Sequence, residues 1–336
     1  MAPRLPTELF ERVMDNLCCN RDALGICGLV SPQWTPRSRH HLFSTVDLSF
    51  PKIPLFIDLL SSPACTFVLS VSRLSLDAIG ATERFVRLVT SPAFGRLAYV
   101  KSLRLANIDW TTFPRVQQVA IESGLARLKQ LTTLEMHALS FHELKGALTL
   151  AGLFPALSRI HLIDIRFSKY LEYNISAAKT YRIPPTWEFV EIDAGDAIPA
   201  FLHCFCLNLA VAPLGIRSLK LLHIEEEHYS YIHGLRLIEF KSATHNGGSP
   251  FTGVSSLVLV SRDEECASLV LLDCEQHTYP HHRTLVLLGC HCASMLASKL
   301  PRTRVVCERL QYKYAGHLLF TTSYNKSSRA RYRTQR

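Results

Sequence analysis

The first 50 residues carry a helical pattern of apolar and polar positions. Leu9, Val13 and Leu17 recur every four residues, which places them on one face of a helix and turns the charged residues between them outward. Thr7 and Glu8 suit the start of this helix, because a side-chain oxygen and a negative charge there meet unpaired backbone N–H groups. The pattern predicts a short amphipathic first helix.

Two further helices are predicted before residue 48. Asp22 can cap the second helix, and Ser31-Pro32 opens a third helix that presents Trp34. Pro36 limits this third helix at its first turn or kinks it. Three such short helices are too small to stand alone as a domain, so the segment predicts a module that binds a partner.

Residues 5–48 resemble the F-box. The positions that match the family's motif are, in order, Leu5, Pro6, Glu8, Leu9, Val13, Leu17, Leu24, Val30, Ser31 and Trp34. Ordered matches over about 30 residues are a stronger signal than a Leu-Pro dipeptide alone. The module docks on a Skp-type adaptor of a cullin-RING ubiquitin ligase in that family, so the resemblance implies the same partner here. The residues that it implies face the adaptor, or support that face, are Leu5, Pro6, Leu9, Val13, Leu24, Val30 and Trp34.

An alternative is that the same residues form a private core of a helical N-terminal cap. Amphipathic spacing shows that a face is buried, but it does not distinguish burial within the chain from burial against a partner. The two interpretations differ in whether the apolar face is exposed in the isolated chain.

After residue 50, short strands return at a nearly constant interval. In each strand two apolar residues are separated by one position, and most strands have another apolar residue three positions later, as in Leu74, Leu76 and Ile79. The first apolar positions are Leu74, Leu103, Leu134, Ile160, Val190, Leu219, Leu257 and Leu285. Consecutive first positions are 26 to 31 residues apart, except that 38 residues separate Leu219 from Leu257. This longer interval contains the turn-rich loop 245–253, and the periodicity predicts a repeat architecture.

Segments between these strands have a helical pattern, for example Thr82 to Thr90 and Val116 to Leu128. The alternation resembles an irregular leucine-rich-repeat solenoid, in which parallel strands form a concave face and helices a convex face. The asparagine that usually follows the strand is present at Asn107, whereas the comparable positions are Ala138, Asp164 and His223. An ordinary α/β domain with a parallel sheet is the alternative, since it shares the alternation.

The predicted fold class is therefore α/β. We expect a three-helix F-box-like module at residues 1–50, an irregular leucine-rich-repeat-like solenoid at residues 51–310 and a basic, disordered tail at residues 311–336. Residues 302–336 contain nine basic residues and one acidic residue, which accounts for +8 of the formal net charge of +9. The high isoelectric point thus indicates a basic tail and not a nucleic-acid-binding domain. The sequence leaves several roles open for such a tail. It could bind RNA, a membrane surface or an acidic partner, it could serve as a nuclear address, or it could be a solvated end without a partner.

The remaining composition favours a cytoplasmic or nuclear protein. No charged segment followed by an apolar one begins the sequence, so secretion is not expected. Eleven irregularly spaced cysteines fit reduced thiols better than a disulfide framework. The uncharged segment from Ile198 to Ile216 contains prolines and polar residues, which favour a buried helix and a turn over a membrane span. We expect no membrane partner, and only weak nucleic-acid binding through the tail.

No catalytic motif or cofactor site is expected. The phosphate-binding, dinucleotide-binding, zinc-protease and serine-hydrolase motifs do not occur. The best metal candidates, whose spacing matches no standard zinc site, are Cys274, His277, His281, His282, Cys290 and Cys292. We expect His203, Cys204 and Cys206 to be packing residues on an apolar helix.

These patterns predict a non-catalytic substrate-recognition adaptor of a Skp-cullin-F-box ubiquitin ligase. The repeats would bind an unknown target protein through outward strand residues, for which the candidates are Ser75, Arg104, Glu135, His161 and Lys220. The main alternative is a scaffold that binds peptide or RNA without ligase attachment. A hydrolase with an unfamiliar site among the C-terminal cysteines and histidines is a third possibility.

Overall fold

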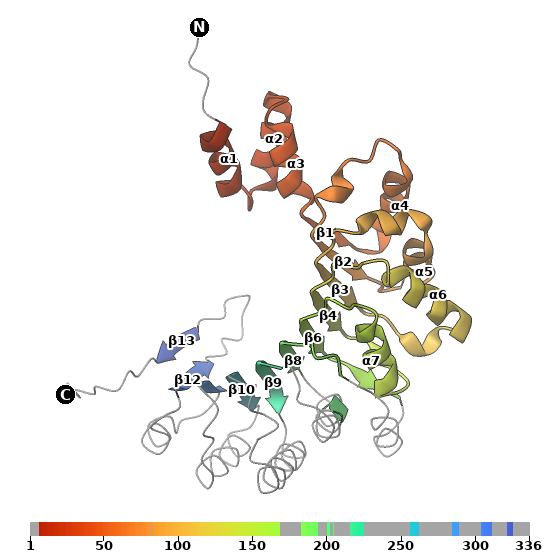
Figure 1. Cartoon of the computed structure of the whole chain (residues 1–336), viewed down its shortest axis with the longest axis vertical. Helices are drawn as coiled ribbons and strands as arrows, with labels where there is room; N and C mark the ends of the chain where they lie inside the picture. Colours follow the sequence, from red (N-terminus) through yellow and green to blue (C-terminus); the bar gives the residue numbers. More distant parts are fainter. Residues whose placement is uncertain are drawn as a thin grey trace, which may run out of the picture. The chain divides into compact units, whose positions relative to one another are not determined.

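The computed structural model describes residues 7–80, 82–168, 183–193, 200–201, 204, 216–224, 256–261, 284–288, 304–310 and 321–324 (Figure 1). The chain divides into two compact units. The first unit comprises residues 1–140 and 150–157, and the second comprises residues 141–149 and 158–336.

The first unit begins with three helices. Their bounds are α1 (Thr7–Asn16), α2 (Arg21–Val30) and α3 (Thr35–Phe43). Asn20, and not Asp22, caps α2, because its side-chain oxygen accepts a hydrogen bond from the N–H of Ala23 at 3.0 Å. The third helix begins at Thr35 and not at Ser31-Pro32 as predicted. Pro36 lies in the first turn of that helix, where a backbone N–H has no intrahelical partner, so the helix continues to Phe43.

Four parallel strands follow in the first unit. They pair in the order β1 (Thr45–Leu48), β2 (Arg73–Asp77), β3 (Ser102–Ala106) and β4 (Thr133–His137). The register pairs Leu74 with Leu103 and Leu103 with Leu134, so the predicted repeat interval is also the pairing interval. These leucines are buried, and the residues between them lie on the other face of the sheet.

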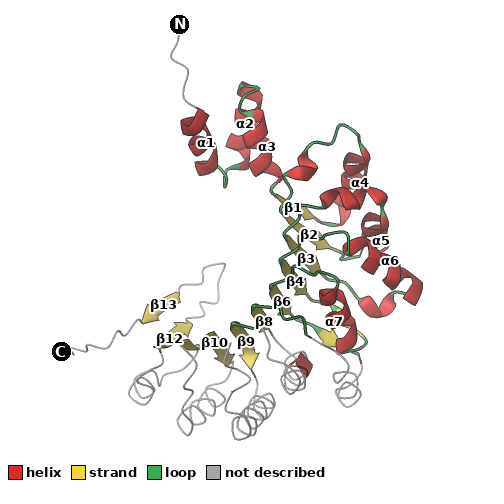
Figure 2. Ribbon diagram, in the orientation of Figure 1, coloured by secondary structure: helices red, strands yellow, loops and turns green. Residues whose placement is uncertain are grey.

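Helices connect the strands of the first unit and lie along one side of them (Figure 2). Their bounds are η1 (Phe50–Lys52), α4 (Ile53–Ser61), η2 (Phe67–Leu69), α5 (Thr82–Thr90), η3 (Pro92–Leu97), η4 (Trp110–Thr112) and α6 (Arg115–Leu125). The predicted helix at 82–90 coincides with α5, and α6 begins one residue earlier and ends three residues earlier than predicted. Phe85 and Leu88 of α5, and Ile121 and Leu125 of α6, are fully buried.

The turn after the strand is the same in several repeats although its residue type differs. Asn107, Ala138 and Asp164 all have positive φ values, of 55°, 50° and 51°. Asn107 additionally donates from its side-chain amide to Oδ1 of Asp77 at 3.0 Å, which joins two neighbouring turns. Ile79, the apolar residue three positions after Leu76, is 62 % exposed.

The second unit continues the parallel pairing. Its sheet order is β6 (Arg159–Ile163), β8 (Phe189–Asp193), β9 (Ser218–Ile224), β10 (Ser256–Ser261), β11 (Thr284–Leu288), β12 (Arg304–Leu310) and β13 (Thr321–Tyr324). The pair β12–β13 is antiparallel. The strand β13 falls within the segment 311–336 that the sequence predicts to be disordered, and its threonines and tyrosine favour extended backbone.

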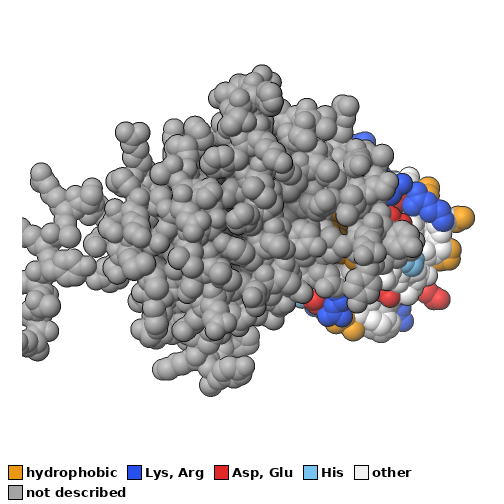
Figure 3. All heavy atoms as spheres, turned by 90° about the horizontal axis from the view of Figure 1, so that it is seen from below, with side chains coloured by type: hydrophobic (Ala, Val, Ile, Leu, Met, Phe, Trp, Pro, Cys, Tyr) orange, Lys and Arg blue, Asp and Glu red, His pale blue; other side chains and the backbone are white. Residues whose placement is uncertain are grey.

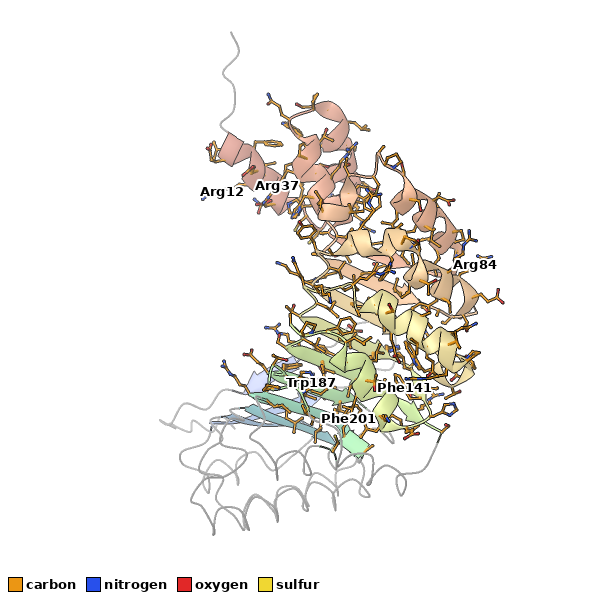
Figure 4. The ribbon with its side chains drawn as sticks, turned by 45° about the vertical axis from the view of Figure 1, so that its right-hand side comes forward. Arg12, Arg37, Arg84, Phe141, Trp187 and Phe201 are labelled. Atoms are coloured by element: carbon orange, nitrogen blue, oxygen red, sulfur yellow. The ribbon has the colours of Figure 1, made fainter. Side chains whose placement is uncertain are left out.

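The boundary between the units passes through β5 (Ser140–Phe141) and α7 (Leu144–Gly152). The short strands β5 and β7 (Arg166–Phe167) form a separate two-stranded sheet. In the second unit Phe141, Trp187 and Phe201 are among the largest fully buried side chains (Figure 4).

The parallel strand pairing and the helices that connect the strands confirm the predicted α/β class with a parallel sheet.

Among the described residues, no helix is both long enough and apolar enough to cross a membrane. The candidate segment from Ile198 to Ile216 falls mostly outside the described part of the chain. Where described side chains are visible in Figure 3, acidic, basic and apolar ones are interspersed.

Candidate partner-binding surfaces

The three N-terminal helices share a small apolar core. Phe10 and Met14 of α1 and Leu24 of α2 are buried together, and partly buried apolar residues surround them. The ring of Trp34 stacks on Phe10 with a centroid distance of 4.9 Å and an interplanar angle of 28°. The face of α1 that enters this core therefore contains Phe10 and Met14. Of the predicted stripe of Leu9, Val13 and Leu17, Leu17 packs against the core, whereas Leu9 and Val13 are exposed.

An ionic network fixes α1 to α3. Asp15 accepts hydrogen bonds from Nε of Arg37 at 2.8 Å and from Nη2 at 2.8 Å, and its Oδ1 lies 2.7 Å from Nε2 of His41. The hydrogen bond with His41, followed by that with Arg37, lowers the pKa of Asp15 below its ordinary value. Arg21 of α2 also donates to the carbonyl of Thr45 at 3.0 Å, just beyond α3.

The helices α1 and α2 leave large apolar side chains exposed to solvent. We call this set the apolar helix residues; its members are Leu9 and Val13 on α1 and Ile26, Leu29 and Val30 on α2. Leu9 and Val13 are 49 % and 52 % exposed, and Leu29 is 90 % exposed. Since the neighbouring core already has its own residues, these side chains are not needed to hold the three helices together.

The predicted adaptor-binding residues fall into three groups. Leu9, Val13 and Val30 are exposed, whereas Leu24 is fully buried and Trp34 is half-buried in the core. Leu5 and Pro6 lie outside the described residues. Leu24 and Trp34 can therefore support a binding face from within, and among the described candidates Leu9, Val13 and Val30 are the exposed ones.

Sequence reasoning missed Ile26 and Leu29. Their spacing of three residues, with Val30 next to Leu29, predicts a second apolar stripe on α2, separate from the stripe through Leu24 and Cys27. The two stripes overlap in such a short helix, and which stripe faces the core is decided by tertiary packing.

The outward candidates in the first unit lie side by side on one sheet face. Ser75 pairs in register with Arg104, and Arg104 pairs with Glu135. Nε of Arg104 lies 2.9 Å from Oε1 of Glu135, and both side chains are partly exposed. These two charges therefore satisfy each other, and exposed ion pairs of this kind contribute little to stability.

The candidates in the second unit form a three-residue cluster around Glu191. His161, Glu191 and Lys220 are in register on β6, β8 and β9. Nδ1 of His161 lies 2.8 Å from Oε2 of Glu191, and Nζ of Lys220 donates to Oε1 at 2.6 Å. The hydrogen bond from His161, followed by that from Lys220, lowers the pKa of Glu191, whose side chain is only 14 % exposed. Sequence reasoning named the two flanking residues but missed the central carboxylate.

The remaining candidates from the sequence are the cysteines and histidines considered as metal ligands or packing residues. Among the described residues, no three His, Cys, Asp or Glu side chains gather in a way that could hold a metal ion. The candidates from Cys274 to Cys292 lie outside the described residues, as do His203 and Cys206. Cys204 is fully buried, as expected for a packing residue.

Comparison with known proteins identifies no family, because the chain matches neither a protein-family model nor a curated protein. The F-box and leucine-rich-repeat resemblances therefore stay predictions from the sequence.

Proposed function

We propose that the chain is a non-catalytic substrate-recognition subunit of a Skp-cullin-F-box ubiquitin ligase. In this proposal α1 to α3 are an F-box that binds a Skp-type adaptor, and the parallel strands are a leucine-rich-repeat-like solenoid that binds a target protein. The observation that carries the proposal is the exposure of Leu9 and Val13 on a helix whose other face, through Phe10 and Met14, is already buried.

Exposed side chains of this size favour a partner on energetic grounds. Full burial of a leucine or valine side chain contributes about 1.5 to 3 kcal/mol. Leu9 and Val13 are one helical turn apart, so a single partner groove can cover both. The distribution of burial favours the partner interpretation of this helix over the private-core alternative, since Phe10 and Met14 form the private core.

The strand geometry supports a repeat architecture. In the first unit consecutive strands pair at intervals of 29 and 31 residues, from Leu74 to Leu103 to Leu134. In the second unit the intervals are 30 and 29 residues, from Ile160 to Val190 to Leu219. A residue with positive φ also follows the strand in several repeats, at Asn107, Ala138 and Asp164. Solenoid proteins of stacked repeats bind their partners through the extended concave sheet face.

The proposed function requires no reacting group in this chain. A subunit that holds a target close to a ubiquitin-carrying enzyme raises the effective concentration of the target's lysines and orients them. The residues that matter are therefore those that bind, and their substitution changes complex formation before it changes any rate of bond formation.

Coexpression with a Skp-type adaptor tests the proposal. We expect the wild-type chain to copurify with the adaptor and Leu9→Asp to reduce the recovered complex at least about tenfold, because a carboxylate cannot enter an apolar groove without losing its hydration. Leu55→Asp is the matched control, since Leu55 on α4 is 63 % exposed and lies outside the three helices. A monodisperse, adaptor-free wild-type chain would contradict the proposal and favour a scaffold without ligase attachment.

A further inference from the structure

The outward sheet face of the second unit combines a cation that has no partner among the described residues with a partly exposed aromatic ring. The register places Arg159, Phe189 and Ser218 in one row, and His161, Glu191 and Lys220 in the next row along the strands. The residues between the rows, Ile160, Val190 and Leu219, are buried on the opposite face. Both rows are therefore on the same side of β6, β8 and β9. We call these six residues the cation-aromatic surface.

The charges on this surface do not cancel. The carboxylate of Glu191 is engaged by both His161 and Lys220. Arg159 is exposed, and no ion pair or hydrogen bond of its side chain occurs among the described residues. Lys220 uses one of its three N–H donors on Glu191 and is 31 % exposed, so it has donors left for a ligand. The surface thus carries an excess of positive charge where the strands begin.

In the described part of the second unit, the other charges near the surface do not neutralise Arg159. Glu188 and Arg217 form a loose pair at 3.8 Å just before their strands begin. Asp193 lies four residues beyond Phe189 on β8, which is roughly 13 Å along a strand, and it is itself engaged in another interaction.

Phe189 supplies the apolar part of the surface. It is only partly buried, and its ring lies 5.2 Å from the ring of His161. A half-exposed phenylalanine beside an arginine suits a ligand that presents an apolar side chain next to a carboxylate. A polyanion such as RNA fits less well, because Glu191 is in the centre of the surface and the described residues provide few free cations.

We propose that the cation-aromatic surface binds an extended acidic peptide segment of a target protein. Carboxylates of the segment contact Arg159 and Lys220, and an apolar side chain of the segment covers Phe189. The inference rests on the proposed function in that it names the chemistry of the target, but the binding itself does not involve the adaptor-binding helices.

The test uses the full chain and a fluorescein-labelled peptide of alternating Asp and Glu with one central Phe, titrated by fluorescence anisotropy at low and at physiological salt. We expect saturable binding that weakens with salt, and about tenfold weaker binding for Arg159→Glu, because the substitution replaces an attraction by a repulsion. Phe189→Ala is expected to weaken binding about threefold to tenfold through loss of apolar contact.

Lys145→Glu is the matched control. Lys145 is an exposed cation on α7, in the same unit but not on the sheet face, so its reversal changes the net charge equally and is expected to change affinity less than about twofold. A peptide in which Lys replaces every acidic residue is expected not to bind. Circular dichroism and the thermal midpoint establish that each variant is folded.

Three results would overturn the inference: no binding of the acidic probe by the wild-type chain, equal binding of the basic probe, or equal effects of Arg159→Glu and Lys145→Glu. Adaptor copurification is measured on the same variants. Peptide binding without adaptor binding would reject the ligase attachment alone, whereas adaptor binding without peptide binding would reject the acidic target alone.

Discussion

Among the described residues of the second unit, Glu191 is the one whose ionisation contributes most clearly to the structure. Its pKa is lower in the folded chain than the ordinary value of 4.5, because His161 and Lys220 hydrogen-bond to the charged form. The unfolded chain therefore binds the proton more readily, so this contribution to stability is present above about pH 4.5 and is lost as the pH falls through the lower folded pKa. Glu191→Gln is expected to lose about 1 to 2 kcal/mol at neutral pH and to show a shallower decrease in acid.

Urea unfolding across this pH range measures the effect. Asp15 has a lowered pKa as well and adds a decrease of the same sign, so the difference between wild type and Glu191→Gln isolates the contribution of Glu191. Glu188→Gln is the matched control, because Glu188 is 53 % exposed and its pair with Arg217 is loose. Parallel pH curves for wild type and Glu191→Gln would contradict the expected role of Glu191.

Gly124 is a position where the fold tolerates no side chain. A Cβ at this position would clash with the carbonyl oxygen of Val89 and lie 2.8 Å from its Cγ1. Gly124→Ala is therefore expected to destabilise the chain by at least about 2 kcal/mol, although alanine is the better helix former. Gly25→Ala on α2 has no atom within 4 Å of the new Cβ and is expected to be neutral or slightly stabilising in the same thermal or chemical unfolding measurement. Equal midpoints for the two variants would mean that α5 and α6 separate easily.

At the scale of elements, Arg96 closes the carboxyl end of α4. Its guanidinium donates to the carbonyl oxygens of Leu60, of Ser62 at 2.9 Å and of Cys65 at 3.0 Å. Leu60 lies in the last turn of α4 and Ser62 is its C-cap, whereas Cys65 follows the helix. The last carbonyls of a helix have no intrahelical partner, so the guanidinium satisfies the end of α4 and also ties it to the segment that follows. Arg96→Ala is expected to cost about 2 kcal/mol of unfolding free energy and to increase amide exchange in α4.

The control for this element is Arg87→Ala on α5. Arg87 is exposed, and no hydrogen bond or ion pair of its side chain occurs among the described residues. Its removal is expected to change stability by less than about 0.5 kcal/mol. An Arg96→Ala variant that unfolds like Arg87→Ala would show that water replaces the guanidinium at no cost.

The elements could be predicted where a local pattern determines them, and not where packing chooses between patterns. The alternation of Leu74 with Leu76, and of Leu103 with Leu105, identifies β2 and β3, because a period of two has only one interpretation in a short segment. The start of α2 was predicted two residues too late, since both Asn20 and Asp22 are good caps.

The candidate sites show the same limit. The exposed Leu9 and Val13 were recognised as one stripe, but a helix of ten residues has a second apolar stripe through Phe10 and Met14, and only the contact with Leu24 decides which one is buried. Glu191 was missed because its role depends on partners about 30 residues away on both sides, in His161 and Lys220. Pairing of this kind is visible only once the strand register is known.

For the whole molecule, the two proposed surfaces belong to different compact units, each with its own buried core. Substitutions at sites that share no partner have additive free-energy effects to within about 0.5 kcal/mol. We therefore expect Leu9→Asp to reduce adaptor binding at least about tenfold and to leave peptide affinity unchanged within about twofold. Arg159→Glu is expected to weaken peptide binding about tenfold and to leave adaptor binding unchanged within about twofold. The double variant should show the sum of the two effects in both assays. An adaptor whose saturation changes peptide affinity in the wild-type chain would instead reveal coupling between the units, and by linkage the peptide would then change adaptor affinity by the same factor.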